Sequence, residues 1–197
     1  MIIGLTGGIA SGKTTAACYL KELGARVISA DQVSREIMAP GQEAYRKVWE
    51  QFGEDILTEE QKIDRSRLGE IIFSDKKKRK QLEEITHPLI IKKIKEKIGE
   101  LQDERKKEVI VVEAPLLFEV GMENMMDQIW VVYCDRETQI ERLVRRDNLS
   151  RAEACSRIDT QMPLEEKKAQ ADVVIRNCGS REELKNKVNA YWQKIVR

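Results

Sequence analysis

The sequence has few of the features that mark secreted, membrane or metal-clustered proteins. Its four cysteines (Cys18, Cys134, Cys155 and Cys178) are widely spaced, with no Cys-x-x-Cys pair. This spacing argues against a disulfide framework or a zinc site and indicates reduced thiols packed as small apolar groups. No apolar run approaches the ~20 residues that a membrane-spanning helix needs, so no membrane partner is expected. Residues 1–6 lack the basic lead-in of a signal peptide, which predicts a cytoplasmic protein.

Neither sign of charge is in excess. The chain has 35 Lys and Arg against 34 Asp and Glu among its 197 residues, a formal net charge of +1. A dedicated nucleic-acid binder would carry a basic surplus, so no nucleic-acid partner is expected; a local basic site for phosphates is compatible with this balance. The length suits one domain with one or two inserted lobes, acting as a monomer or a small homo-oligomer.

Alternating apolar and helical patterns predict an α/β protein. An apolar run at 2–6, a helical pattern at 13–23 and a second apolar run at 26–30 form a βαβ unit, which implies a parallel sheet. Three further continuous apolar runs predict strands covered on both faces; they lie at 109–112, 129–133 and 172–175. We therefore expect a three-layer fold with a five-stranded parallel sheet flanked by helices.

Two polar helical segments interrupt this pattern. The first follows the second strand; its apolar spacing from Leu82 to Leu101 is interrupted only at His87-Pro88, and it is too long for a simple crossover. The second is a charged hairpin that suits a mobile lid. A helix over 180–196 ends the chain. The expected organisation is a single domain, 1–197, with a nucleotide core (1–31, 108–135 and 171–197), a helical substrate lobe (32–107) and a two-helix lid (136–170).

The strongest motif is the segment Gly7–Thr14, which fits G-x-x-x-x-G-K-[ST] without a mismatch. Its position between a predicted strand and a predicted helix lets backbone N–H groups and the helix N-terminus surround a phosphate. Lys13 would contact the β- and γ-phosphates, and Thr14 would coordinate Mg²⁺. A dinucleotide site is not favoured, because G-x-G-x-x-G is absent. The predicted ATP-binding residues of this motif are Gly8, Ile9, Ala10, Ser11, Gly12, Lys13, Thr14 and Thr15.

Acidic residues end two of the predicted strands. Asp31 follows the second strand, which is expected beside the first, so its carboxylate would face the γ-phosphate and accept or aim an acceptor hydroxyl. The structural alternative is a helix N-cap. Glu113 ends the third strand and is a candidate Mg²⁺ ligand, or else a loop residue at the sheet edge.

Basic residues of the predicted lid form a candidate phosphate clamp. Arg142 and Arg146 are four residues apart and share a helix face, while Arg145 and Arg157 lie nearby. A guanidinium from this group would neutralise charge on the phosphoryl oxygens, and with Lys13 we expect Arg142 to be catalytic. Solvated surface pairs are the alternative. The run Lys76–Lys80 indicates a solvated patch.

Together these residues resemble the dephospho-CoA kinase family over almost the whole chain. The residues that carry the likeness are Leu5–Thr14, Ala30-Asp31, Ile63-Asp64-Arg65, Leu68, Phe73, His87-Pro88, Pro115–Glu119, Glu141-Arg142-Leu143, Arg146-Asp147, Arg157-Ile158, Gln161-Met162, Ala171-Asp172 and Asn177. The chain departs from the family pattern at Ser29, where an acid is usual, and at Arg176.

The resemblance implies the substrates ATP and dephospho-CoA, with Mg²⁺ as cofactor and the ribose 3′-hydroxyl as acceptor. It implies that Asp31 faces that hydroxyl and that the other acceptor-site residues are Arg65, His87, Pro115 and Leu116. From the residues alone, His87 is equally compatible with a purely structural role. A nucleoside or nucleoside monophosphate kinase of the same fold is the main alternative. A GTP-dependent switch is disfavoured, since the sequence has neither Asn-Lys-x-Asp nor Asp-x-x-Gly; a non-catalytic scaffold would show no nucleotide-dependent change in stability.

Overall fold

The computed structural model describes residues 1–104 and 108–196 of the chain. Residues 105–107, in the expected substrate lobe, and residue 197, in the expected core, lie outside the described residues. The chain forms two compact units, one of Met1–Ser29 with Leu101–Arg197 and the other of Ala30–Glu100. Each unit is described by itself.

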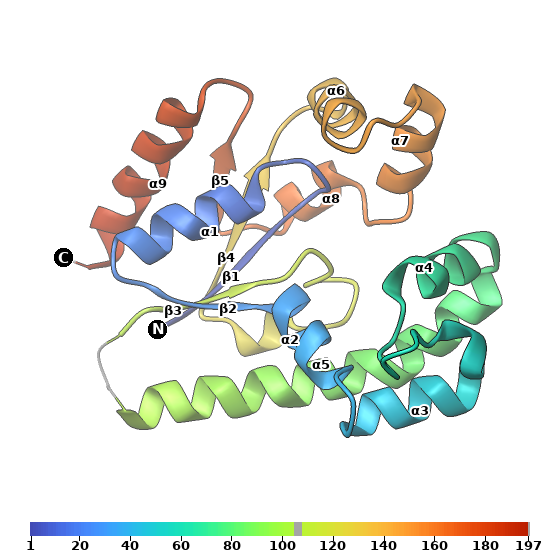
Figure 1. Ribbon diagram of the computed structural model, residues 1–197. Helices are drawn as coiled ribbons and strands as arrows, with labels where there is room; N and C mark the ends of the chain where they lie inside the picture. Colours follow the sequence, from blue (N-terminus) through green and yellow to red (C-terminus); the bar gives the residue numbers. More distant parts are fainter. Residues whose placement is uncertain (105–107, 197) are drawn as a thin grey trace. The chain divides into compact units, whose positions relative to one another are not determined.

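A five-stranded parallel sheet forms the centre of the first unit (Figure 1). Its strands in chain order are β1 (Ile2–Gly7), β2 (Arg26–Ser29), β3 (Ile110–Glu113), β4 (Gln128–Tyr133) and β5 (Val173–Arg176). The spatial order is β2-β3-β1-β4-β5. The predicted fold class is therefore confirmed, including the number and the parallel direction of the strands.

The expected neighbour of β1 was wrong. β3 lies between β1 and β2, so that Leu5 of β1 pairs with Glu113 of β3 and with Trp130 of β4. At about 4.8 Å between neighbouring strands, the end of β2 is therefore about 10 Å from β1. The strand that ends directly beside β1 carries Glu113, and the argument from strand adjacency for Asp31 does not hold.

Alternation along β1 decides which helices cover the sheet. Ile3 and Leu5 point into a core shared with α1 (Lys13–Glu22) and α9 (Arg181–Ile195), two helices that lie together on one side of the sheet (Figure 1). A Cβ at Gly4 would point to the other face of the sheet, toward Leu117 and Met126 of the β3–β4 connection. The absence of a side chain at Gly4 lets this connection pack directly against the strand.

The second unit is helical. Apolar side chains from its elements form a separate core around Val48, Ile56 and Leu68. Asp64 caps the helix that begins at Arg65 by accepting hydrogen bonds from the N–H groups of Ser66 and Arg67. Its helices are α2 (Ala30–Ile37), α3 (Glu43–Phe52), the short 3₁₀ turn η1 (Glu54–Ile56), α4 (Arg65–Ser74) and most of α5 (Lys76–Glu104).

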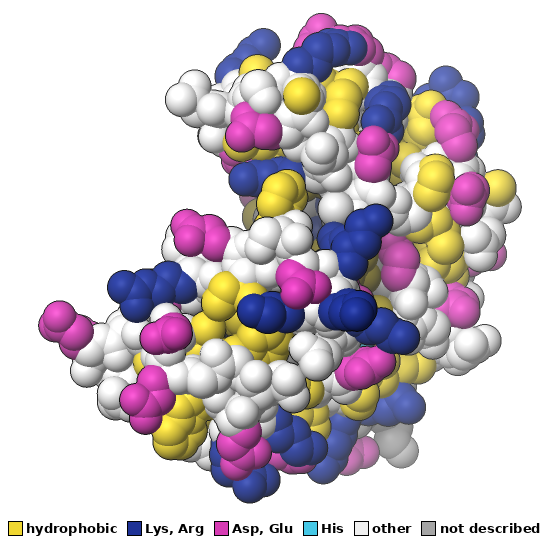
Figure 2. Space-filling model, turned by 90° about the vertical axis from the view of Figure 1, so that its right-hand side faces the viewer, with side chains coloured by type: hydrophobic (Ala, Val, Ile, Leu, Met, Phe, Trp, Pro, Cys, Tyr) yellow, Lys and Arg dark blue, Asp and Glu magenta, His cyan; other side chains and the backbone are white. Residues whose placement is uncertain are grey.

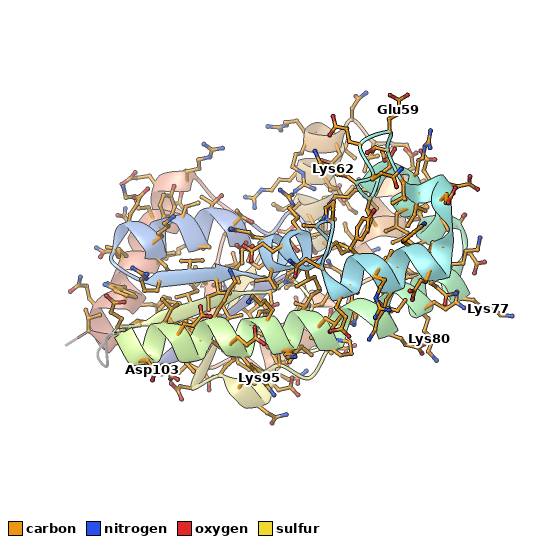
Figure 3. The ribbon with its side chains drawn as sticks, turned by 60° about the horizontal axis from the view of Figure 1, so that its bottom comes forward. Glu59, Lys62, Lys77, Lys80, Lys95 and Asp103 are labelled. Atoms are coloured by element: carbon orange, nitrogen blue, oxygen red, sulfur yellow. The ribbon has the colours of Figure 1, made fainter. Side chains whose placement is uncertain are left out.

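The expected interruption at His87-Pro88 was wrong, because α5 runs through Pro88 without ending. Proline removes the N–H that would bond the carbonyl of Glu84, but Glu84 is exposed and water can take that place. The run Lys76–Lys80 begins this helix, and Lys77 and Lys80 point outward (Figure 3). This agrees with the predicted solvated patch.

Three helices lie between β4 and β5 in the chain: α6 (Arg136–Asp147), α7 (Arg151–Ile158) and α8 (Leu164–Ala169). α6 and α7 share a small apolar core of their own, against which Ile9 and Ala10 of the glycine-rich loop also pack. α8 packs beside β4. The segment expected to form the lid thus contains one helix that lies against the sheet.

Charges of both signs interleave over the face shown in Figure 2, in keeping with the net charge of +1. Among the described residues, no helix is long and apolar enough to cross a membrane.

Candidate active site

The glycine-rich loop between β1 and α1 has a backbone that few residues could replace. Gly12 has a φ of +93°, and a Cβ there would lie 2.1 Å from Nδ2 of Asn177. A Cβ on Gly8 would lie 2.3 Å from Nε2 of Gln139. Ala10 also has a positive φ, 60°, which is uncommon for a residue with a side chain. Positive φ values of this kind occur in loops whose backbone N–H groups bind a phosphate.

Side chains from other segments fix this loop. Nε2 of Gln139, in α6, donates to the carbonyl of Ile9 at 2.8 Å, and the N–H of Ile9 donates to Oε1 of Gln161 at 3.0 Å. Nδ2 of Asn177, after β5, donates to the carbonyl of Ser11 at 2.7 Å. Gln139 was not among the predicted site residues, because an isolated glutamine in a polar helix carries no signal of its burial.

Two residues of the loop converge on Glu113. Nζ of Lys13 lies 2.9 Å from Oε1 of Glu113, and the Thr14 hydroxyl donates to the same oxygen at 2.7 Å. Lys13 is 8% exposed and Glu113 is 5% exposed, so the ion pair is shielded from water. The parallel pairing of β3 with β1 brings the carboxylate to the loop.

The oxygen atoms at this point suit a magnesium ion. A hydroxyl and a carboxylate are hard donors that Mg²⁺ accepts, together with phosphate oxygens and water. The buried hydroxyl of Ser11 has no hydrogen-bond partner among the described residues, as expected of a loop that is completed by a phosphate. The residues present therefore fit both a triphosphate and its metal.

The arginines of α6 differ in their surroundings. Arg146 binds both carboxylate oxygens of Asp147, at 2.7 and 3.0 Å, and Arg157 donates to the same carboxylate at 3.1 Å. Arg142 is half-buried and has no carboxylate partner among the described residues. Burial raises the pKa of the Cys134 thiol to about 11, and the charge of Arg142 opposes that shift. Arg142 therefore lies near the end of β4 with its charge uncompensated.

The second unit contains Asp31, Arg65 and His87. Asp31 lies exposed in the first turn of α2 and is not its N-cap, because the helix already begins at Ala30. Arg65 is the first residue of α4, and His87 is half-buried in α5. Partial desolvation lowers the pKa of Arg65, the charge of Arg35 lowers it further, and Asp31 opposes both. Asp31, Arg35 and Arg65 thus share one neighbourhood; Arg35, four residues after Asp31, was missed.

Pro115 and Leu116 begin the turn after β3. The carbonyl of Pro115 accepts a hydrogen bond from Nζ of Lys167 at 2.6 Å and one from the Thr6 hydroxyl at 3.4 Å. Lys167 also pairs with Glu119. Lys167 was not predicted either, because it stands in a charged run that indicates solvent exposure.

The fold has a parallel sheet with a phosphate-binding loop after its central strand, and a lysine and a hydroxyl of this loop meet one carboxylate. These features define a P-loop kinase, an enzyme that transfers a phosphoryl group to a hydroxyl. The family model described as dephospho-CoA kinase matches residues 1–183. The chain belongs to the dephospho-CoA kinase family, which confirms the resemblance seen in its sequence.

Individual relatives agree over the full length. The dephospho-CoA kinase of Carboxydothermus hydrogenoformans is 50% identical over 193 residues, 98% of this chain and 93% of the relative. That of Geobacter sulfurreducens is also 50% identical over 193 residues and 98% of each chain. The solved structure of dephospho-CoA kinase from Campylobacter jejuni has a TM-score of 0.74 and 36% identity, and covers 98% of this chain and 96% of that one.

Proposed function

We propose that this protein transfers the γ-phosphoryl group of ATP to the ribose 3′-hydroxyl of dephospho-CoA, giving coenzyme A and ADP. One observation carries the proposal: Lys13 and Thr14 of the P-loop converge on Glu113. The chain also matches the family model over residues 1–183. The reaction belongs to the last step of coenzyme A synthesis. We place it in the cytoplasm, in a monomer or small homo-oligomer without nucleic-acid or membrane partners.

ATP binds through the loop. Residues 8–15 bind ATP, with backbone N–H groups of the loop around the β-phosphate, and the Lys13 ammonium moves from Glu113 to the phosphates. Thr14 and Glu113 would hold Mg²⁺, which would supply positive charge to the phosphate oxygens. The short contacts of Lys13 and Thr14 with Oε1 of Glu113, which is buried, support this assignment.

Arg142 stabilises the phosphoryl group during transfer, and Arg146 assists ATP binding. The uncompensated charge of Arg142 near the end of β4 supports the first role, because a free guanidinium is available to phosphate oxygens. Arg146 would have to leave Asp147 to contact ATP directly. We therefore expect the Arg142→Ala substitution to lower kcat more than Arg146→Ala does.

Asp31 accepts the proton of the acceptor hydroxyl or aims it at the γ-phosphate. Arg65, His87, Pro115 and Leu116 are the further residues that we propose to bind dephospho-CoA. The positive charges of Arg35 and Arg65 around Asp31 support an anionic acceptor, since Arg favours phosphate groups.

A panel of acceptors with ATP and Mg²⁺ tests the proposal. We expect dephospho-CoA to give a higher kcat/KM than adenosine, AMP, CMP or shikimate. Lys13→Met should abolish transfer, whereas Lys21→Met, an exposed lysine in the last turn of the same helix, should behave like the wild type. Preference for a nucleoside or nucleoside monophosphate would replace this function with the alternative named above.

A further inference from the structure

Lys167 is a charged side chain without access to water. It lies in α8, and its exposure is 0%. Nζ of Lys167 lies 2.7 Å from Oε1 of Glu119 and donates to the carbonyl of Pro115 at 2.6 Å. Lysine is almost never fully buried unless it is paired, so these two contacts account for the burial.

The two hydrogen-bond acceptors of Lys167 belong to one short segment, residues 115–119, which we call the acceptor turn. They stand at its first and last residues, so a single ammonium group ties together both ends of the turn. The side chain of Glu119 is 21% exposed, although the residue as a whole lies at the surface. Its Oε1 also accepts a hydrogen bond from the N–H of Met162 at 3.0 Å, in the segment between α7 and α8.

The same contacts reach the ATP loop. Gln161, next to Met162, binds the N–H of Ile9, and the Thr6 hydroxyl at the end of β1 donates to the Pro115 carbonyl. Burial lowers the pKa of Lys167, and the nearby Lys13 ammonium adds to that shift, while Glu119 opposes it. Lys167 therefore lies close to the phosphate site and contacts the turn rather than the site itself.

We propose that Lys167 is a positioning residue that holds the acceptor turn in register with the ATP loop. The proposal rests on the function above, which assigns Pro115 and Leu116 to dephospho-CoA binding. An ammonium group is required because it donates to two acceptors at once; a methionine of similar length fills the same space and donates to neither. Loss of Lys167 would remove the shorter of the two hydrogen bonds to the Pro115 carbonyl and leave Glu119 without its counter-charge.

The kinetic test compares Lys167→Met with Lys168→Met. Lys168 is the adjacent lysine; it is half-buried and pairs with the exposed Glu165, and it contacts neither Pro115 nor Glu119 among the described residues, so it is a matched control. We expect Lys167→Met to raise the KM for dephospho-CoA by about tenfold or more and to change the KM for ATP by less than about threefold, because a small displacement of a positioning segment can cost up to about 10²-fold. Lys168→Met should match the wild type.

A double-mutant cycle of Lys167→Met and Glu119→Gln distinguishes a positioning role of Lys167 from a general loss of stability. Since Glu119 and Lys167 hold the same turn, the double variant should bind dephospho-CoA no worse than Lys167→Met does. Equal losses in both KM values and kcat, additive effects in the cycle, or Lys167→Met kinetics that match Lys168→Met would each overturn the proposal.

Hydrogen–deuterium exchange gives a readout that does not need activity. In Lys167→Met we expect faster exchange in residues 115–122, with residues 8–15 unchanged when ADP is bound. Unchanged exchange in 115–122 would show that Lys167 does not hold the turn. A wild-type protein that leaves dephospho-CoA unphosphorylated would instead refute the proposed function, while the exchange result still decides the role of Lys167.

Discussion

The pairing of Lys13 with Glu113 leads to a prediction about the protein without nucleotide. Glu113→Gln keeps the shape of the side chain but removes the charge that neutralises Lys13, whose ammonium is buried at 8% exposure. Removing one partner of a buried ion pair costs about 3–5 kcal/mol. The glutamine oxygen still accepts a hydrogen bond, so we take the lower value, about 3 kcal/mol, for the loss in the free energy of unfolding.

For a chain of this length, about 3 kcal/mol corresponds to a fall in Tm of roughly 6–12 °C. ADP should then stabilise the variant more than the wild type. In the wild type the phosphates must displace Glu113 from Lys13, whereas in Glu113→Gln they supply the missing counter-charge. Thermal unfolding with and without ADP, in EDTA to exclude metal binding by Glu113, measures both effects.

Glu22→Gln is the control, because Glu22 is an exposed residue at the end of α1 and pairs only loosely with Lys185, at 3.8 Å. It should leave both the Tm and the ADP-induced shift unchanged. The reasoning is refuted if Glu113→Gln melts within about 2 °C of the wild type, well below the fall that a broken buried pair implies. An ADP-induced shift no larger than that of the wild type would refute it as well.

Three further predictions concern catalysis, the loop and pH. Asp31→Asn should lower kcat by about 10²-fold or more with ATP affinity unchanged, as for a positioned acid–base group; wild-type turnover would remove Asp31 from the mechanism. Gly12→Ala should abolish ATP binding in calorimetry, because its Cβ meets Asn177, whereas Gly24→Ala, with φ +106° and nothing within 4 Å, should lose stability only; retained ATP binding in Gly12→Ala would contradict the loop geometry. Hydrogen bonding and charge from Arg146 lower the pKa of Asp147, with a further contribution from the charge of Arg157. The ionised Asp147 carboxylate therefore stabilises the fold fully above the ordinary carboxyl pKa, and this stabilisation is lost as pH falls through the lowered pKa. Asp147→Asn should therefore lose less stability than the wild type in thermal melts below about pH 4, and equal acid sensitivity would argue against this pair.

Patterns of neighbouring residues along the chain predicted the strands and the glycine-rich loop. The five apolar runs became the five strands, and Gly7–Thr14 predicted the loop between β1 and α1. Strand order was not accessible in this way, because the placement of β3 beside β1 depends on how crossovers pack and leaves no mark in the strands themselves. The same limit applies to Pro88, whose tolerance in α5 depends on the exposure of Glu84.

Site residues follow the same division. Lys13, Thr14 and Glu113 stand in motifs or at strand ends, and the structure brings them together. Gln139 and Lys167 have ordinary polar sequence surroundings, yet both are buried against backbone carbonyls. Tertiary packing alone decides whether such a side chain faces solvent or a carbonyl, so no pattern along the chain distinguishes them.

The most direct test of the central claim is the position of the transferred phosphate. The protein is incubated with ATP, Mg²⁺ and dephospho-CoA, and the product is examined by ³¹P NMR and mass spectrometry. A single added phosphate on the ribose 3′-oxygen, formed by the wild type and not by Lys13→Met, is the result that the account predicts. A phosphate at another position, or equal yield from Lys13→Met, would contradict it.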